Sequence, residues 1–66
     1  MILFYFKNWY NKDKHFFIKA KNEKEAKAIL KRKYFFTHKD YLILCSIKDN
    51  SINRKKYLQD NIILND

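Results

Sequence analysis

Lys24, Lys27 and Lys31 are spaced i, i+3 and i+7, so a helix over this segment would carry all three on one face. Arg32 and Lys33 follow directly and add two more cations. Ammonium and guanidinium groups that share a surface attract phosphates by Coulomb attraction and by the release of counterions. We therefore expect this face to contact nucleic acid or a nucleoprotein complex.

The charge of the whole chain agrees with this expectation. The formal net charge is +8, and residues 12–39 hold ten basic residues, Lys19 among them, against three acidic ones. The 13 lysines and two arginines favour contact with the nucleic-acid backbone, because arginine leads in bidentate recognition of bases. The alternative is a solvated lysine face inflated by A/T-rich codons, which would also explain the absence of glycine and proline.

Two groups of aromatic residues could bind a partner. Trp9 and Tyr10 fall in a predicted polar turn, where exposed aromatic rings often anchor protein interfaces.

Tyr5, Phe17 and Tyr41 could form a stacking platform for bases on one face of a sheet, with Lys7 and Lys19 beside it. The interpretation that we prefer is that most of the aromatic rings form the hydrophobic core.

The remaining candidates for chemistry have simpler explanations. A phosphate-binding glycine loop is impossible, because the chain has no glycine. His15, His38 and Cys45 are too widely spaced for a zinc site, and a single cysteine forms no internal disulfide. We expect Cys45 to be a core residue. The acidic residues are scattered, and Glu23 and Glu25 suit the first turn of a helix. The sequence therefore predicts a protein that is not an enzyme and has no metal or cofactor.

Strands and one helix are expected to position these residues. Residues 1–7 and 15–20 are rich in aromatic and branched side chains and predict a β-hairpin whose first strand lies inside the sheet. Asn22 is a good N-cap for a helix at about residues 23–33. Residues 41–47 are almost entirely apolar, so we place this strand centrally in the sheet.

The last part of the chain allows more than one conformation. Residues 34–40 could continue the helix or form a short strand and turn. Residues 49–51 offer a helix start, 52–60 a short helix, and 62–64 an edge strand or a segment docked on the core. We predict an α+β fold in a single domain, residues 1–66: a β-hairpin, then one helix packed on a sheet of three or four mostly antiparallel strands, and a short C-terminal helix or strand.

The opening apolar stretch is too short for a signal peptide or a membrane span, so we expect a cytoplasmic protein without membrane contact. Its size and composition resemble those of short accessory proteins of phages and other mobile elements of low-GC bacteria. That resemblance implies an alternative function: an inhibitor that binds and blocks a host protein, such as a defence nuclease (anti-CRISPR-like) or a polymerase. A homo-oligomer formed through an exposed apolar face is a third possibility.

Overall fold

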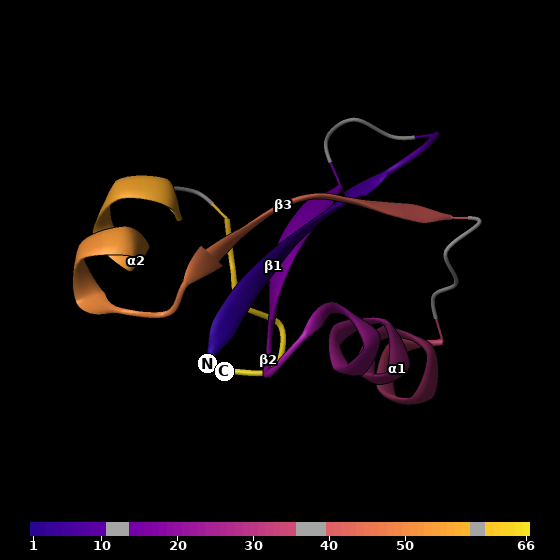
Figure 1. Ribbon diagram of the computed structural model, residues 1–66. Coiled ribbons are helices and arrows are strands. Elements are labelled where there is room, and N and C mark those ends of the chain that lie inside the picture. The colour runs from indigo at the N-terminus through magenta and orange to yellow at the C-terminus, as the bar shows by residue number, and fades with distance from the viewer. Residues whose placement is uncertain (11–13, 36–39, 59–60) are drawn as a thin grey trace.

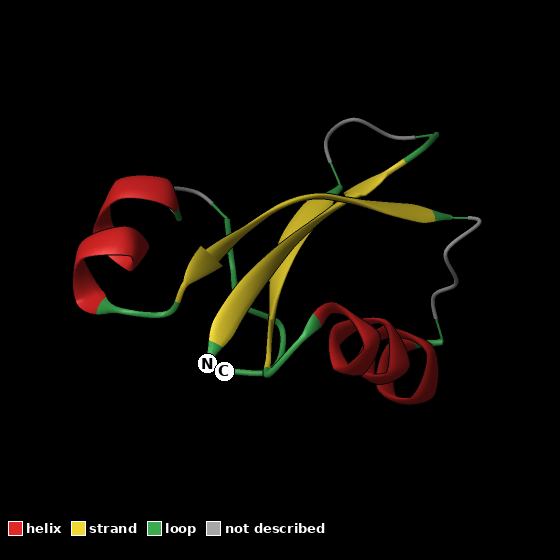
Figure 2. Cartoon of the chain, viewed as in Figure 1, coloured by secondary structure: helices red, strands yellow, loops and turns green. Residues whose placement is uncertain are grey.

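The computed structural model describes residues 1–10, 14–35, 40–58 and 61–66. Along the chain these form β1 (Ile2–Asn8), β2 (His15–Ala20), α1 (Glu23–Tyr34), β3 (Tyr41–Lys48) and α2 (Ser51–Tyr57) (Figures 1 and 2). The predicted α+β class is confirmed: a hairpin, one main helix, an antiparallel sheet and a short C-terminal helix.

The three strands pair in the order β2-β1-β3. β1 is the inner strand, as the sequence predicts, and both of its neighbours run antiparallel to it. The predicted central position of residues 41–47 is wrong, because β3 lies at the edge of the sheet. Of its residues only Tyr41 is buried. An apolar run shows low polarity but does not show burial on both faces, and here the two differ.

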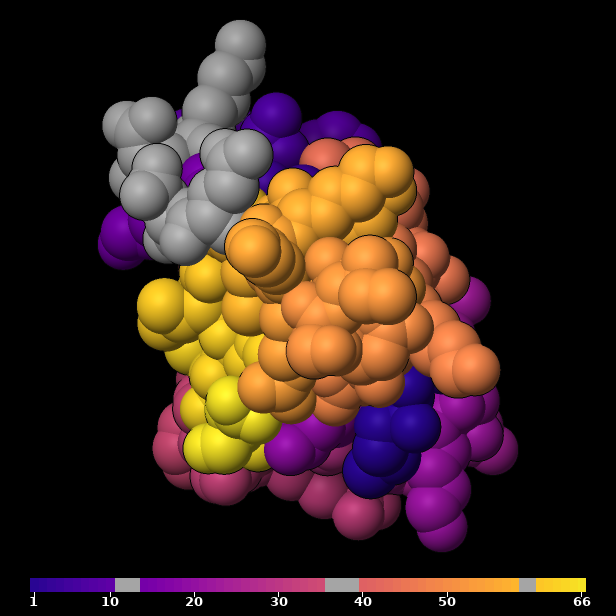
Figure 3. Space-filling model, turned by 90° about the vertical axis from the view of Figure 1, so that its left-hand side faces the viewer, coloured from indigo at the N-terminus to yellow at the C-terminus, as the bar shows by residue number. Residues whose placement is uncertain are grey.

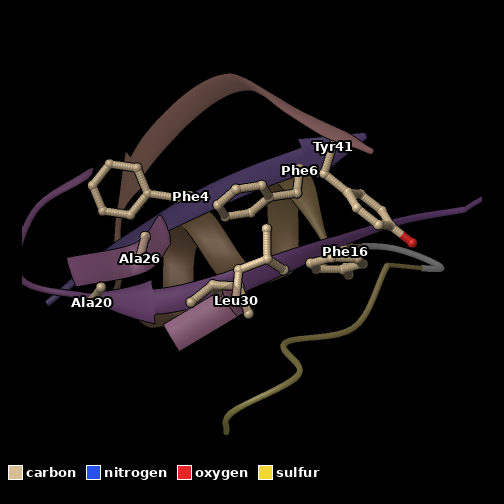
Figure 4. Packing of buried hydrophobic residues seen from close by; sticks show 8 residues of the cluster. Phe4, Phe6, Phe16, Ala20, Ala26, Leu30 and Tyr41 are labelled. Carbon is tan, nitrogen blue, oxygen red and sulfur yellow. The ribbon is translucent and has the colours of Figure 1, made fainter. Parts of the chain in front are cut away.

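The main hydrophobic core lies between the sheet and α1 (Figure 4). Alternate residues of β1 and β2 point toward the helix, as the twofold period of a strand requires. The buried members are Phe4, Phe6, Phe16, Ile18, Ala20, Ala26, Leu30 and Tyr41. Aromatic rings supply much of this core, with Phe6 against Phe16 at 5.8 Å and Phe16 against Tyr41 at 5.0 Å between ring centroids. The interpretation that most aromatic rings form the hydrophobic core is confirmed for these rings.

The two ends of α1 follow from local chemistry. Asn22 Oδ1 accepts a hydrogen bond from the Glu25 N–H at 2.8 Å, which satisfies one donor of the first turn. The helix runs one residue beyond the predicted end, to Tyr34. Phe35 then adopts a left-handed conformation, with φ 60° and ψ 21°, and donates its N–H to the Leu30 carbonyl. The two conformations predicted for residues 34–40 cannot be compared at 36–39, which lie outside the described residues.

α2 lies on the other side of the sheet from α1 (Figure 1). It begins at the predicted position, with Asn50 as its N-cap: Asn50 Oδ1 accepts from the Asn53 N–H at 2.8 Å. Figure 3 shows α2 and the C-terminal segment covering much of this side of the molecule. Leu3 and Phe17, which alternate with the residues that face α1, are buried on this side. The sheet is therefore covered on both faces over part of its length.

The C-terminal segment runs along the outer edge of β2. The Phe17 N–H donates to the Ile62 carbonyl at 2.8 Å, and the Leu64 N–H donates to the Phe17 carbonyl at 2.9 Å. Ile63 forms a parallel bridge with Phe17, so the edge-strand alternative is borne out over a short length. The Tyr34 hydroxyl donates to the Leu64 carbonyl at 2.8 Å and joins this segment to the end of α1.

Candidate functional site

The lysine face of α1 is the surface that the fold presents most directly. Ala26 and Leu30 are buried against the sheet, so the opposite side of the helix points away from the molecule. Lys24, Lys27 and Lys31 are all exposed. Arg32 and Lys33, in the last turn, are exposed as well. The structure therefore brings these five predicted site residues together on one rigid element.

Most of the cations on this face have no carboxylate partner among the described residues. Lys27 Nζ lies 3.2 Å from Glu23 Oε1, one helical turn away, and that ion pair is exposed. No ion pair joins Lys24, Lys31 or Arg32 to any residue that the structure describes. An exposed pair such as Lys27–Glu23 contributes little stability, so a phosphate can compete for the lysine.

Lys33 and the first turn of α1 lie at the margins of this surface. The Lys33 ammonium lies 5.8 Å from the centre of the Tyr34 ring, within the range of a cation–π contact. A shallow hollow at the start of the helix is lined by Asn22, Glu23, Lys24 and Lys27. These groups form an open cationic surface, suited to an extended anion and not to an enclosed small molecule.

Lys19 does not belong to this surface. It lies in β2 on the side of the sheet opposite α1, and its ammonium is 3.2 Å from Asp66 Oδ1. Its backbone is bound by one side chain: the Lys19 N–H donates to Asn65 Oδ1 and the Asn65 amide donates to the Lys19 carbonyl, both at 2.7 Å. Lys19 therefore holds the C-terminal segment on the face of the sheet away from α1.

The proposed stacking platform is wrong. Tyr41 is buried on the α1 side, 5% exposed, whereas Tyr5 points to the other side. Phe17 is 3% exposed and packs against Tyr5 with ring centroids 5.0 Å apart. Burial, and next the neighbouring Cys45, raise the pKa of the Tyr5 hydroxyl. The strand period alone could not reveal this, because the register shift between β1 and β3 changes which residues share a face.

Trp9 and Tyr10 are exposed, as expected for residues beyond the end of β1; their exposed fractions are 59% and 85%. The Trp9 N–H donates to the Asp40 carbonyl at 2.9 Å, which holds this residue against the start of β3. Trp9 lines an apolar hollow of about 240 Å³ together with Lys7, Asn8, Leu42 and Leu44. Sequence reasoning missed the two leucines, because only the pairing of β1 with β3 brings them to Trp9.

The prediction that Cys45 is a core residue is also wrong. The thiol is exposed on β3, on the face away from α1. The physical reason is the edge position of β3, since α1 covers only the opposite face of this strand. His15 is half-buried and packs edge-on against Tyr5, with ring centroids 5.7 Å apart, which is a structural contact. His38 lies outside the described residues.

Arg54 has a structural function that the sequence did not reveal. Its guanidinium binds Asp49 through Nε at 2.6 Å and Nη2 at 3.0 Å, and binds Asp66 through Nη1 at 3.0 Å and Nη2 at 3.1 Å. These hydrogen bonds lower the pKa of the Asp49 carboxyl. They also lower the pKa of Asp66, with Lys19 as the second cause. The basic run at 54–56 is therefore partly a connector between α2 and the chain end.

The described residues lack two features that would point to other classes of site. Among the described residues, no group of three or more histidine, cysteine or acidic side chains could hold a metal ion. None of the described helices has the length and apolar character needed to cross a membrane. Comparison with protein-family models, with curated proteins and with solved structures finds no match to this chain. The fold and the site define a small α+β protein with two exposed surfaces, one cationic and one apolar.

Proposed function

We propose that this protein is a non-enzymatic binding protein that contacts nucleic acid, free or within a nucleoprotein complex, through the outer face of α1. The observation that supports it is the set of exposed cations of α1, four of which pair with no described carboxylate. Elsewhere Asp49 and Asp66 are bound by Arg54. Four of the described cations without a carboxylate partner therefore lie on one helix, while others, such as Lys55 and Lys56, lie elsewhere.

The geometry favours contact with phosphates over recognition of bases. Lys24 and Lys31 are seven residues apart, which is roughly 10 Å along the helix axis. That length spans about three phosphates of one strand, which advance about 3.4 Å each along a duplex. Lysine ammonium groups bind phosphate as point charges and give little base discrimination. We therefore expect binding that is weakly dependent on sequence.

Salt dependence measures this contact. Neutralising about three phosphates gives a slope of about −2.7 for the logarithm of affinity against the logarithm of salt concentration. Affinity should then fall about 40-fold between about 50 and about 200 mM salt. The assay is fluorescence anisotropy with a labelled duplex and a labelled single strand, each of mixed sequence.

Matched variants locate the surface. Lys24→Gln and Lys31→Gln should each reduce the magnitude of the slope by about 1. Lys55→Gln and Lys56→Gln, on α2, remove the same charge on the other side of the sheet and should leave the slope unchanged. Circular dichroism checks that every variant is folded. No binding at low salt, or equal effects of both pairs, would overturn the proposal.

A second candidate function is the inhibitor of a host protein, as in mobile elements. The observation in its favour is the exposure of Trp9 and Tyr10. It predicts that Trp9→Ala or Tyr10→Ala weakens activity more than charge reversal at Lys24, Lys27 and Lys31, and that binding survives moderate salt. If the lysine changes alone abolish activity, this candidate is wrong.

A further inference from the structure

The two edges of the sheet differ in what covers them. The outer edge of β2 is occupied: Phe17 pairs with the C-terminal segment, and Asn65 binds both backbone groups of Lys19. β3 forms the other edge, where no described segment adds a strand, although the Lys48 carbonyl at its end accepts from the Asn53 amide at 2.8 Å. Proteins usually cover or interrupt such edges, because unpaired backbone groups there accept another strand. Among the described residues, a paired segment covers the β2 edge but not the β3 edge.

The pairing pattern shows which backbone groups face outward on β3. The backbone groups of Phe17 and Lys19 point toward the C-terminal segment, so those of the alternate residues in β2 pair with β1. In β1 the even-numbered residues therefore pair with β2, and the backbone groups of the odd-numbered residues point toward β3. The Trp9 N–H bond to the Asp40 carbonyl agrees with this assignment. Alternation then turns the backbone groups of the intervening β3 residues outward. These include Ile43 and Ser46, and also Lys48, whose carbonyl already accepts from the Asn53 amide.

Apolar side chains adjoin this edge. Trp9, Leu44 and Leu42 are 59%, 49% and 41% exposed, and all three line the hollow of about 240 Å³. The register between β1 and β3 skips Leu44, which is the extra residue of a β-bulge. A group of large exposed apolar side chains on a small protein commonly marks an interaction site, and tryptophan is a frequent anchor at such sites.

Charge identifies the kind of occupant. Lys7 lines the hollow, Lys48 ends the strand, and no ion pair joins either to a described residue. A second copy of this chain is a poor match, because its net charge is also +8. Its carboxylates at Asp49 and Asp66 are already bound by Arg54. The complementary partner is therefore acidic.

We infer that the outer edge of β3 from Ile43 to Ile47 docks an extended acidic segment of a partner protein, which adds a fourth strand and places an aliphatic or aromatic side chain in the hollow beside Trp9. Backbone hydrogen bonds supply affinity in this mode, and the pocket for alternate side chains supplies specificity. The inference does not depend on the nucleic-acid contact, because the hollow is on the face of the sheet away from α1.

The test is selection of peptides from a random peptide library displayed on phage, with the full chain as bait. We expect selected peptides in which acidic and apolar residues alternate. A synthetic peptide of the selected sequence should shift the fluorescence of Trp9, the one tryptophan of the chain, to shorter wavelength. Only every second N–H group of an added edge strand donates a hydrogen bond to β3. N-methylation of the peptide residues that donate should therefore abolish binding, and N-methylation of the residues between them should leave it intact.

Variants of the chain separate the alternatives. Leu44→Glu should weaken the peptide about 30-fold or more, as loss of an interface anchor does, whereas Lys24→Gln should leave its affinity unchanged. Trp9→Phe keeps an aromatic ring and should retain most of the affinity for the peptide. Because this variant lacks the tryptophan signal, its binding is measured by the anisotropy of a labelled peptide. Basic or charge-free selected sequences, or affinity that depends on Lys24 and not on Leu44, would overturn the inference. So would a dimer in sedimentation that Leu44→Glu dissociates, since a second copy would then be the occupant.

Discussion

Phe35 carries a backbone cost that a single substitution should relieve. With φ 60° and ψ 21° it is the one described residue with positive φ, and it stands where helices usually place glycine. A residue with a Cβ atom loses about 1–2 kcal/mol in this conformation. Glycine avoids that cost, but it lowers the free energy of unfolding by about 0.4–1 kcal/mol because it gives the unfolded chain more conformational freedom. The Phe35 ring is 84% exposed, so its removal sacrifices little burial.

We therefore expect Phe35→Gly to raise the free energy of unfolding by about 0.5–1 kcal/mol. In a domain of this length the melting temperature should rise by about 2–8 °C. Urea denaturation and thermal melting followed by circular dichroism measure both quantities.

Phe35→Ala is the matched control, because it removes the ring but keeps the Cβ atom. It should leave stability within about 0.5 kcal/mol of the parent protein. If Phe35→Gly is no more stable than Phe35→Ala, the left-handed backbone is not the source of the cost and the reasoning fails.

Two further predictions concern the C-terminal segment. Asn65→Ala removes both hydrogen bonds to the Lys19 backbone and should lower the free energy of unfolding by about 1–3 kcal/mol, with faster hydrogen exchange at the Lys19 amide; unchanged exchange there would contradict the assignment. Arg54 holds the pKa values of Asp49 and Asp66 below their ordinary value of 3.8. Their contribution to stability is therefore complete above that value and is lost as the pH falls through the lowered pKa values, so urea titrations from about pH 5 to about pH 2 should show stability falling. Arg54→Gln should flatten that fall, and an equally steep curve in the variant would show that other carboxylates cause it.

Local chemistry made much of the fold predictable. The N-cap Asn22 was recognisable, and Asn50 lies within the predicted helix start at 49–51, because a side-chain oxygen three residues before a helical N–H is a short-range feature. The lysine face of α1 was predictable for the same reason, since helical spacing alone sets which residues share a side. β1 as the inner strand followed from apolar residues on both of its faces.

The features that the sequence did not predict depend on contacts between distant segments. β3 and residues 1–7 have similarly apolar sequences, and only the packing order decided that β1 is central and β3 lies at the edge. The exposure of Cys45, the burial of Tyr41 and the hollow beside Trp9 all follow from that order and from the bulge at Leu44.

By itself, then, the sequence determined the element types, the caps and the charge of α1, because these depend on residues within a few positions of one another. The tertiary structure alone decided which cations remain available. Lys19 is engaged by Asp66, and Arg54 by Asp49 and Asp66, through partners as distant as 47 positions in the chain. Lys24, Lys31 and Arg32 have no such partner among the described residues, because α1 turns them away from the sheet. Long-range pairing thus removed Lys19 and Arg54 from the available cations, whereas the cations of α1 stayed exposed.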